Sequence, residues 1–295
     1  MAGVLLKIGA EALVTMYTVV ARTSLFSPMV QSAFRAIVIP MAILPFVPFF
    51  GSYIFTSRWI ILGIINALHI ISSLEGFKVL PTGPAVTIYF TYPLLAVFLS
   101  YLLLGRELGV SSLLGILLAF SGVILLNYNT KETALLDKES SVSMNLTGIG
   151  WILISAITQA LLYIFVISGD KVYDNHYLLI MSLYFWAGIA GAIYLFTNVD
   201  FYSKHQEVGQ KKQEPSLFSM SSLYLVFANL VFGVGGMILL HGTARIIPAA
   251  QYNALSYIGV LFGYIYGILQ GDGIRGKDII ASVLVIAGSL FGGLS

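Results

Sequence analysis

Residues 83–126 read GPAVTIYFTYPLLAVFLSYLLLGRELGVSSLLGILLAFSGVILL and consist of two apolar runs separated by a short polar turn. Each run has about 20 residues, the length that an α-helix needs to cross the hydrocarbon core of a bilayer. The two charges of the stretch, Arg106 and Glu107, are adjacent and lie in the turn. The stretch therefore predicts two membrane-spanning helices, at 83–104 and 110–127, joined by a tight connection.

The whole chain has the composition of a membrane protein. Of its 295 residues, 58% are hydrophobic and 9% are charged, whereas about a quarter of the residues of a soluble domain are charged. The net charge of +2 and the scattered lysines and arginines exclude a nucleic-acid-binding module. The absence of cysteine excludes disulfides and thiolate metal sites. We therefore expect a lipid bilayer to surround the protein.

Ten apolar runs of this length are separated by charges, proline or glycine. The predicted spans are residues 4–21, 31–51, 59–77, 83–104, 110–127, 147–168, 176–197, 220–243, 247–270 and 277–293. A charged side chain costs about 2.5–3.5 kcal/mol at the centre of a spanning helix, so the charged segment 128–146 cannot lie in hydrocarbon. The sequence predicts an all-α polytopic membrane protein, with one five-helix unit at 1–127, a polar connecting loop at 128–146 and a second five-helix unit at 147–295.

The two halves resemble each other locally. Residues 11–14 align with 159–162, and residues 91–93 in the fourth span align with 256–258 in the ninth. An odd number of spans in each half inserts the second half upside down relative to the first, which predicts an inverted repeat. Two such halves can open one central site to either side of the membrane in turn, so the pattern favours transport over catalysis.

Several motifs resemble those of the drug/metabolite transporter superfamily, in its EamA-like type with ten helices. Pro93 lies inside the fourth span, Glu107 lies in the following turn, and Arg35 in FRAIVIP resembles an arginine of the family's second span. The second half repeats the pattern more loosely, with Asp272 where the family usually has glutamate. Ile258 replaces the second-half proline, so the ninth span is expected to lack a kink.

The resemblance implies a transporter of the plasma (inner) membrane and no enzyme. It implies that both chain ends face the cytoplasm, whereas the lysines and arginines, five on that side and nine on the other, predict the reverse. The orientation therefore stays open. Glycines at every fourth position of the ninth span, 259, 263, 267 and 271, predict close helix packing or the surface of a homodimer.

Glu11 is the first candidate for substrate binding or coupling. It lies near the middle of the first span, where a carboxylate usually faces an aqueous cavity or a charged partner. It is expected either to take up and release a proton or to bind a cationic group of the substrate. The alternative is a structural ion pair with Lys7 or Arg35. Gln159, the counterpart of Glu11 in the second half, is expected to form hydrogen bonds at the same site or between helices.

Other polar side chains of the spans complete the predicted site. Asn66 and His69 share one helix face, tyrosines and an asparagine of the fourth and ninth spans suit a small organic solute, and two arginines could hold an anion or extend to the membrane surface. The predicted site residues are Glu11, Gln159, Asn66, His69, Tyr89, Tyr92, Tyr257, Asn253, Arg35 and Arg245.

No enzyme motif occurs in the chain, and its four histidines are scattered, so we expect neither metal nor cofactor. The sequence thus predicts a secondary transporter of a small polar or zwitterionic metabolite, such as an amino acid or an amine. Coupling of this transport to protons is one mechanism that the sequence allows. One alternative is an exchanger of anionic substrates, either nucleotide sugars or sugar phosphates. Another is a membrane scaffold that transports nothing.

Overall fold

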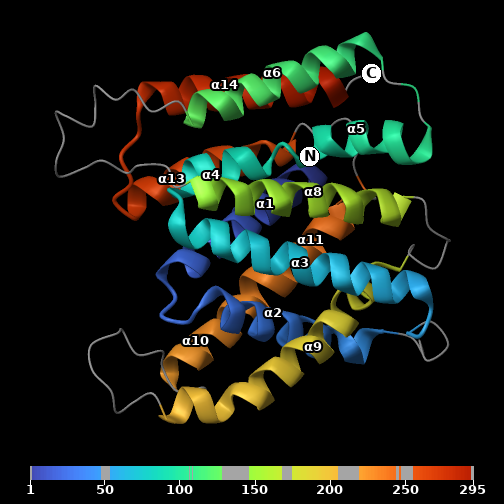
Figure 1. The fold of residues 1–295 in the computed structure, drawn as a ribbon, viewed down its shortest axis with the longest axis vertical. Helices are drawn as coiled ribbons and strands as arrows, with labels where there is room; N and C mark the ends of the chain where they lie inside the picture. The colour runs from blue at the N-terminus through green and yellow to red at the C-terminus, as the bar shows by residue number, and fades with distance from the viewer. Residues whose placement is uncertain are drawn as a thin grey trace.

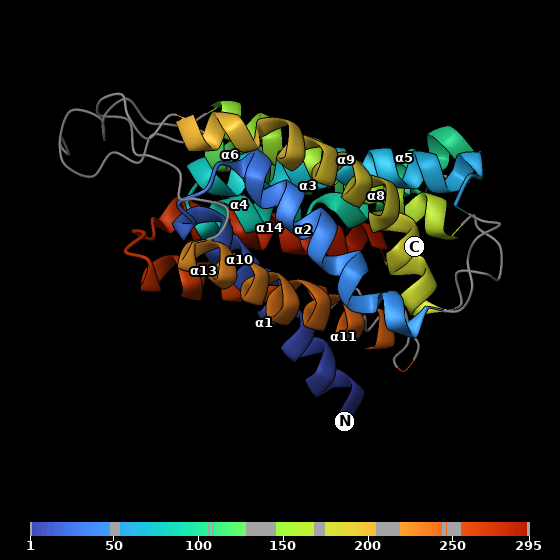
Figure 2. The ribbon, with the colours of Figure 1, turned by 90° about the horizontal axis from the view of Figure 1, so that it is seen from below.

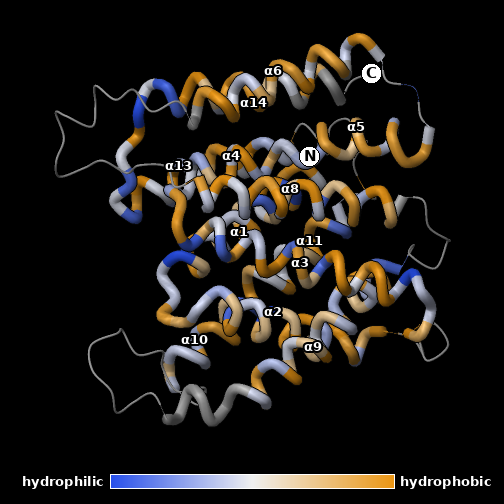
Figure 3. Tube along the Cα trace, in the orientation of Figure 1, coloured by the Kyte–Doolittle hydropathy of each residue, from blue (hydrophilic) through white to orange (hydrophobic). Residues whose placement is uncertain are grey.

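The computed structural model describes residues 2–47, 54–105, 107, 109–127, 146–167, 175–204, 219–243, 246 and 255–293. Its helices lie side by side and run across the long axis of the molecule (Figure 1). The view from below shows the N-terminal end of α1 projecting from the body of the protein (Figure 2). Hydrophobic residues dominate the helices, and hydrophilic stretches lie mainly at the turns (Figure 3).

The helices follow the predicted spans. The first half contains α1 (Ala2–Thr23), α2 (Pro28–Ile43) with the 3₁₀ turn η1 (Leu44–Phe46), α3 (Ser57–Val79), α4 (Thr82–Tyr89), α5 (Tyr92–Leu104) and α6 (Val110–Asn127). The second half contains α8 (Leu146–Ile167), α9 (His176–Lys204), α10 (Met220–Ala228), the π-helix η3 (Asn229–Gly235), α11 (Gly236–Thr243), α13 (Ile258–Leu269) and α14 (Gly276–Gly293).

Seven segments of the described chain are long and apolar enough to cross a membrane. They are Ala2–Thr23, Pro28–Phe46, Ser57–Val79, Thr82–Leu104, Leu146–Phe165, His176–Thr197 and Met220–Thr243. The predicted fifth and ninth spans contain the shorter apolar helices Leu113–Leu125 and Ile258–Leu269, and α14 occupies the tenth. The prediction of an all-helical protein with multiple membrane spans is therefore confirmed.

Two spans, the fourth and the ninth, are interrupted. The fourth is broken between α4 and α5, where Pro93 lies in the first turn of α5 and cannot donate the backbone hydrogen bond of a continuous helix. The ninth is also interrupted, by a turn at Tyr257 directly before α13. The prediction that the ninth span lacks a kink was wrong, because the chain turns at Tyr257 although Ile258 takes the place of proline.

Most helices of the first half pack against a helix of the second half. The principal pairs are α6 with α14, α3 with α8, α2 with α9, α4 with α13, and α1 with both α11 and α13. Figure 1 shows α6 and α14 running together along one edge, with α2 and α9 together near the opposite edge. The hydrophobic core therefore lies mainly between the two halves.

Glycines allow α13 to approach α4 closely. A Cβ atom at Gly259 would lie 2.6 Å from Phe90 Cζ, and one at Gly263 would lie 2.9 Å from Val86 Cβ. On the facing helix, a Cβ atom at Gly83 would lie 2.4 Å from Tyr264 Cδ1. These positions exclude larger side chains. The stripe of glycines thus packs inside one chain at Gly259 and Gly263, which takes both residues out of any surface for a second copy.

A polar cluster at one end of the bundle ties three helices together. Arg22, at the end of α1, donates from Nη1 to Asp272 Oδ2 at 2.5 Å. The same oxygen accepts from the backbone N–H of Thr82 at 3.0 Å, and Gln270 Oε1 accepts from the Thr82 hydroxyl at 2.8 Å. Gly271 adopts φ = +85°, a conformation that glycine adopts without strain. We call Arg22, Thr82, Gln270 and Asp272 the end cluster.

Asp272→Asn is expected to lower the melting temperature. The amide keeps the size of the side chain but loses the negative charge that both donors contact. Because Arg22 is partly exposed, we expect a loss of about 1 kcal/mol, or on the order of 2–4 °C, measured by scanning fluorimetry in detergent. Glu107→Gln is the matched control, since Glu107 is exposed in the corresponding turn of the first half. Equal effects of both substitutions would mean that the end cluster contributes no stability.

Candidate functional site

A buried ion pair lies on α1. Lys7 and Glu11 are one helical turn apart, and the distance from Lys7 Nζ to Glu11 Oε1 is 2.5 Å. Lys7 is 1% exposed and Glu11 is 3% exposed, so both charges are removed from the surroundings of the protein. Of the partners that the sequence offered to Glu11, the structure brings Lys7 into contact. Paired charges inside a membrane protein are rare and usually mark a functional position.

The ion pair lies beside the breaks of both interrupted spans. The Ser256 hydroxyl, just before the turn at Tyr257, hydrogen bonds to the Glu11 carboxylate. Glu11 Oε2 lies so close to Gly259 that a Cβ atom there would be 3.1 Å away, and the Phe90 ring from the other break borders the same glycine. In transporters, the ends of interrupted helices often lie at the sites that bind ions and substrates.

Aromatic rings surround the two breaks. The ring centroid of Phe90 lies 5.6 Å from that of Tyr89, 6.1 Å from that of Tyr92 and 6.1 Å from that of Tyr257. The structure thus brings together the three tyrosines that the sequence selected from the fourth and ninth spans. Phe90, at the centre of the group, was not selected, although its position beside Tyr89 and two residues before Tyr92 was a signal. Such rings offer apolar faces and hydroxyl groups to an organic solute.

His69 joins α3 to α8 next to the aromatic rings. Its Nδ1 lies 3.1 Å from the carbonyl oxygen of Ser155 and 3.4 Å from the hydroxyl oxygen of Thr158. Nδ1 also lies 3.2 Å from Ser155 Oγ, so it can donate to the Ser155 carbonyl in one tautomer or accept from a hydroxyl in the other. The centroid of the His69 ring lies 6.0 Å from that of Tyr89. His69 therefore packs two helices together and also borders the group of aromatic rings.

Arg35 lies in a second polar cluster. Its guanidinium carbon is 4.1 Å from the centroid of the Tyr17 ring, and its Nε donates to the Tyr184 hydroxyl at 3.4 Å. A cation over an aromatic face is stabilised by the negative charge density of the ring. Sequence reasoning did not select Tyr17 or Tyr184. No local signal pointed to them, because their relation to Arg35 depends on the packing of α1 and α9 against α2.

The remaining predicted site residues divide into three groups. Asn66 is buried and donates from Nδ2 to the carbonyl oxygen of Leu183 at 2.9 Å, so its amide connects α3 to α9. Gln159 is half-buried on α8, and its side chain forms no hydrogen bond with any residue that the structure describes. Arg245 and Asn253 lie outside the described residues.

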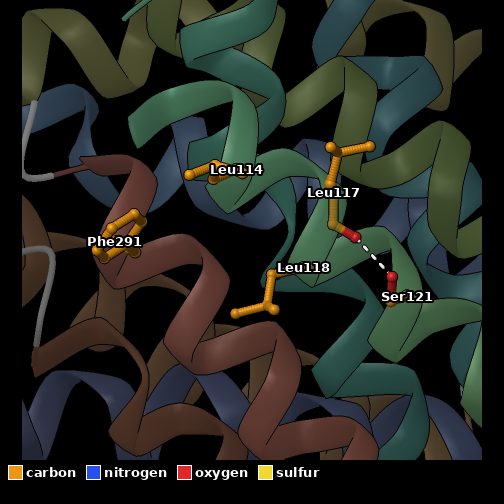
Figure 4. A pocket seen from close by; sticks show the side chains of 5 residues that line it. All are labelled: Leu114, Leu117, Leu118, Ser121 and Phe291. Atoms are coloured by element: carbon orange, nitrogen blue, oxygen red, sulfur yellow. Dashed lines mark hydrogen bonds between the residues drawn. The ribbon is translucent and has the colours of Figure 1, made fainter. Parts of the chain in front are cut away.

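The described residues contain no group of three or more histidine, cysteine, aspartate or glutamate side chains that could hold a metal ion. A hollow of about 410 Å³ lies between α6 and α14, lined by Leu114, Leu117, Leu118, Ser121 and Phe291. In Figure 4 its one hydroxyl, that of Ser121, donates to the carbonyl oxygen of Leu117 on its own helix. The hollow is apolar, and its leucines are exposed as lipid-facing side chains are. It lacks the polar groups that a hydrophilic solute requires.

Comparison with known proteins bears on the first half most directly. Residues 1–128 match the EamA-like transporter family. Twenty-six chains of solved structures also match. One of them, a crystal structure, shares 16% sequence identity with a TM-score of 0.56, and the alignment covers 99% of this chain and 96% of that chain. At this identity the likeness concerns the fold alone. No curated protein matches the sequence.

The family match agrees with the fold. The EamA-like family is a family of transporters and not of enzymes, as the sequence predicted. The match is consistent with a lipid bilayer as the surroundings and a small molecule as the substrate. Residues 1–128 are therefore an EamA-like transporter domain of the drug/metabolite transporter superfamily, in a chain with several helices long and apolar enough to cross a membrane.

Proposed function

We propose that the protein moves a small polar or zwitterionic metabolite, such as an amino acid or an amine, across the plasma (inner) membrane by alternating access. The observation that carries this proposal is the buried Lys7–Glu11 pair beside the two helix breaks. Charged side chains at this depth are costly, and a packing role alone could be filled by apolar residues. Interrupted helices next to an ion pair provide both a binding site and a place where the helices can bend.

We further infer that residues 1–127 and 147–295 are inverted repeats, joined by the loop 128–146. The pattern of helix contacts supports this inference. The pairs α2 with α9, α4 with α13 and α6 with α14 each join a helix to its counterpart in the other half. In this inference α8 is the counterpart of α1, and α11 belongs to the counterpart of α3. The contact of α3 with α8 should therefore have an equivalent in a contact of α1 with α11, and both contacts are present. Such matched contacts allow two arrangements of similar energy, related by exchange of the halves about a pseudo-two-fold axis, which alternating access needs.

In this proposal the Lys7–Glu11 pair couples binding to movement. While the pair is closed, each charge neutralises the other. When a proton or a cationic group of the solute binds to the Glu11 carboxylate, the ion pair between Glu11 and Lys7 breaks. The freed ammonium is then buried without a partner unless the helices around it rearrange, because Lys7 is 1% exposed. Binding is thereby linked to a change in the packing of α1 against α13.

Anion exchange, with nucleotide sugars or sugar phosphates as substrates, is the second candidate function. Arg35 favours it, because this interior cation contacts two tyrosines and no carboxylate among the described residues. However, phosphate recognition usually requires several neighbouring arginines or lysines. The two candidates therefore differ in the charge of the solute that should bind.

Ligand-induced stabilisation of the purified protein distinguishes the candidates. A ligand that binds only the folded protein raises its melting temperature. We expect amino acids or amines to raise the melting temperature of the wild type and of Glu75→Gln, a matched control at the far end of α3. The same ligands should have no effect on Glu11→Gln. Uptake of the stabilising compound into proteoliposomes would then establish transport.

Other outcomes overturn the proposal. Stabilisation by nucleotide sugars or sugar phosphates alone would replace it with anion exchange. An unchanged ligand response in Glu11→Gln would remove Glu11 from the site. If no compound stabilises the protein and none enters proteoliposomes, the proposed substrate class is wrong, and the scaffold alternative gains support.

A further inference from the structure

Arg35 is an interior cation without an anionic partner among the residues that the structure describes. The described residues contain three ion pairs, Lys7–Glu11, Arg22–Asp272 and Arg275–Asp278, and Arg35 belongs to none of them. Its Nε donates to the Tyr184 hydroxyl and its guanidinium also lies near the Tyr17 hydroxyl, but neither Nη1 nor Nη2 forms a hydrogen bond of standard geometry with any residue that the structure describes. Charged groups inside membrane proteins normally pair with an opposite charge or line a path for a charged solute. Arg35 is the eighth residue of α2 and is half-buried, which fits a residue that lines a path for a charged solute.

Two buried polar atoms beside Arg35 have close neighbours but no hydrogen bond of standard geometry among the described residues. The hydroxyl oxygen of Tyr17 and Oδ1 of Asn229 have no hydrogen-bond partner of standard geometry in the described part of the chain. Tyr17 is 5% exposed and Asn229 is fully buried. The two side chains are neighbours, and the Arg35 guanidinium lies over the Tyr17 ring. Unsatisfied buried polar atoms are rare in native proteins, and here two of them adjoin an unpaired cation.

The backbone around Asn229 is itself unusual. Asn229–Gly235 form a π-helix inside the eighth span, and this segment contacts both α1 and α2, which carry Tyr17 and Arg35. The Asn229 Nδ2 group donates to the carbonyl oxygen of Leu225 at 2.8 Å, so the amide is held with its oxygen free to accept. π-Helical turns inside longer helices are frequently found at functional sites.

This cluster lies close to the site that contains Glu11. Tyr17 follows Glu11 by six residues on α1, which is about 9 Å along the helix axis. Arg35 is within electrostatic range of His69, whose ring centroid lies 6.0 Å from that of Tyr89 in the group of aromatic rings. The Arg35 cluster and the helix breaks therefore lie in the same interior region, among helices of both halves.

We propose that Arg35, Tyr17 and Tyr184 bind the carboxylate of the transported solute and that Asn229 Oδ1 accepts a hydrogen bond from an adjacent N–H or O–H group. The two Nη groups of a guanidinium match the two oxygens of a carboxylate, and the hydroxyl of Tyr17 can donate to the same anion. The ligand class is an α-amino or α-hydroxy acid. This inference rests on the proposed transport function, since it defines the substrate class and leaves Glu11 free for coupling.

The test uses three probes with the full-length protein in detergent: a mixture of neutral L-amino acids, the corresponding amino acid amides, and inorganic phosphate. We expect the amino acids to raise the melting temperature of the wild type and the amides, which lack the carboxylate, to have no effect. Arg35→Gln should abolish the shift. Arg275→Gln, an arginine of the turn before α14, is the matched control and should keep it.

Milder variants cover the case in which Arg35→Gln does not fold. Tyr17→Phe and Tyr184→Phe remove one hydroxyl each and keep the rings. We expect each to weaken the apparent affinity for the amino acids about tenfold. Stabilisation by the amides equal to that by the acids, or by phosphate alone, would overturn the carboxylate site.

The test separates this inference from the proposed function. If amino acids still stabilise Arg35→Gln and both phenylalanine variants as they do the wild type, Arg35 has no role in binding, whereas transport stands. If no probe stabilises the wild type and radiolabelled amino acids do not enter proteoliposomes, both the carboxylate site and the transport of zwitterions are wrong.

Discussion

Lys7→Met is expected to destabilise the protein more than any other single substitution in α1. It leaves the Glu11 carboxylate buried beside Ser256 without its counter-ion, which lies at 2.5 Å in the wild type. Removing one partner of a buried ion pair costs about 3–5 kcal/mol. For a chain of this size we expect the melting temperature to fall on the order of 10 °C, measured by scanning fluorimetry in detergent.

The double variant Lys7→Met/Glu11→Gln separates loss of pairing from loss of packing. It contains no buried charge at this site, so it should regain most of the stability that Lys7→Met loses. Lys277→Met, at the beginning of α14, controls for the general effect of replacing a lysine by methionine. A Lys7→Met variant as stable as the wild type would mean that Glu11 is uncharged in the folded protein, and the coupling scheme would then fail.

Gly263→Val is expected to separate α13 from α4 and to abolish transport. A Cβ atom at this position would lie 2.9 Å from Val86 Cβ and 3.1 Å from Val86 Cγ2, and branched side chains in helices have little freedom to move aside. Overpacking of this kind costs about 1–3 kcal/mol or more. We expect a lower melting temperature together with loss of solute uptake into proteoliposomes.

Gly9→Val is the matched control, because Gly9 also lies in a helix and a Cβ atom there would meet nothing within 4 Å. Shortening the opposing side chain should compensate, so Gly263→Ala/Val86→Ala should be more stable than Gly263→Ala alone. If Gly263→Val and Gly9→Val are equally stable, the glycines do not pack against α4. The stripe would then be available to a second copy of the chain, as the sequence also allowed.

Much of the fold could be predicted because the membrane imposes one simple requirement, a helix of about 20 apolar residues. The runs at 59–77 and 220–243 were recognisable from composition alone, and helices occupy both. The turn at Tyr257 could not be predicted from the residue that usually marks it, because proline is absent there. The turn is evident only in the three-dimensional structure, where Ser256 and Gly259, on either side of it, both lie next to the Glu11 carboxylate.

The candidate site could be predicted most easily where a residue is unusual by itself. Glu11 was found because a carboxylate in the middle of an apolar run is costly wherever it lies. Tyr184 and Asn229 were missed because tyrosine is common near membrane surfaces and asparagine often joins helices. Their relevance depends on Arg35, which is 149 residues before Tyr184 in the chain. Such a relation appears only after the two halves are packed together.

The interleaving of the helices has a consequence for how the protein is made. The segment that matches the transporter family, residues 1–128, is synthesised first, yet α2, α3, α4 and α6 have their principal packing partners among helices synthesised later. Until the segment with Ser256 and α13 is inserted, Glu11 lacks its contacts with Ser256 and Gly259. The first half therefore stays incompletely packed in the bilayer until the second half is inserted. A chain that stops after the first half should be degraded unless the second half is supplied as a separate polypeptide.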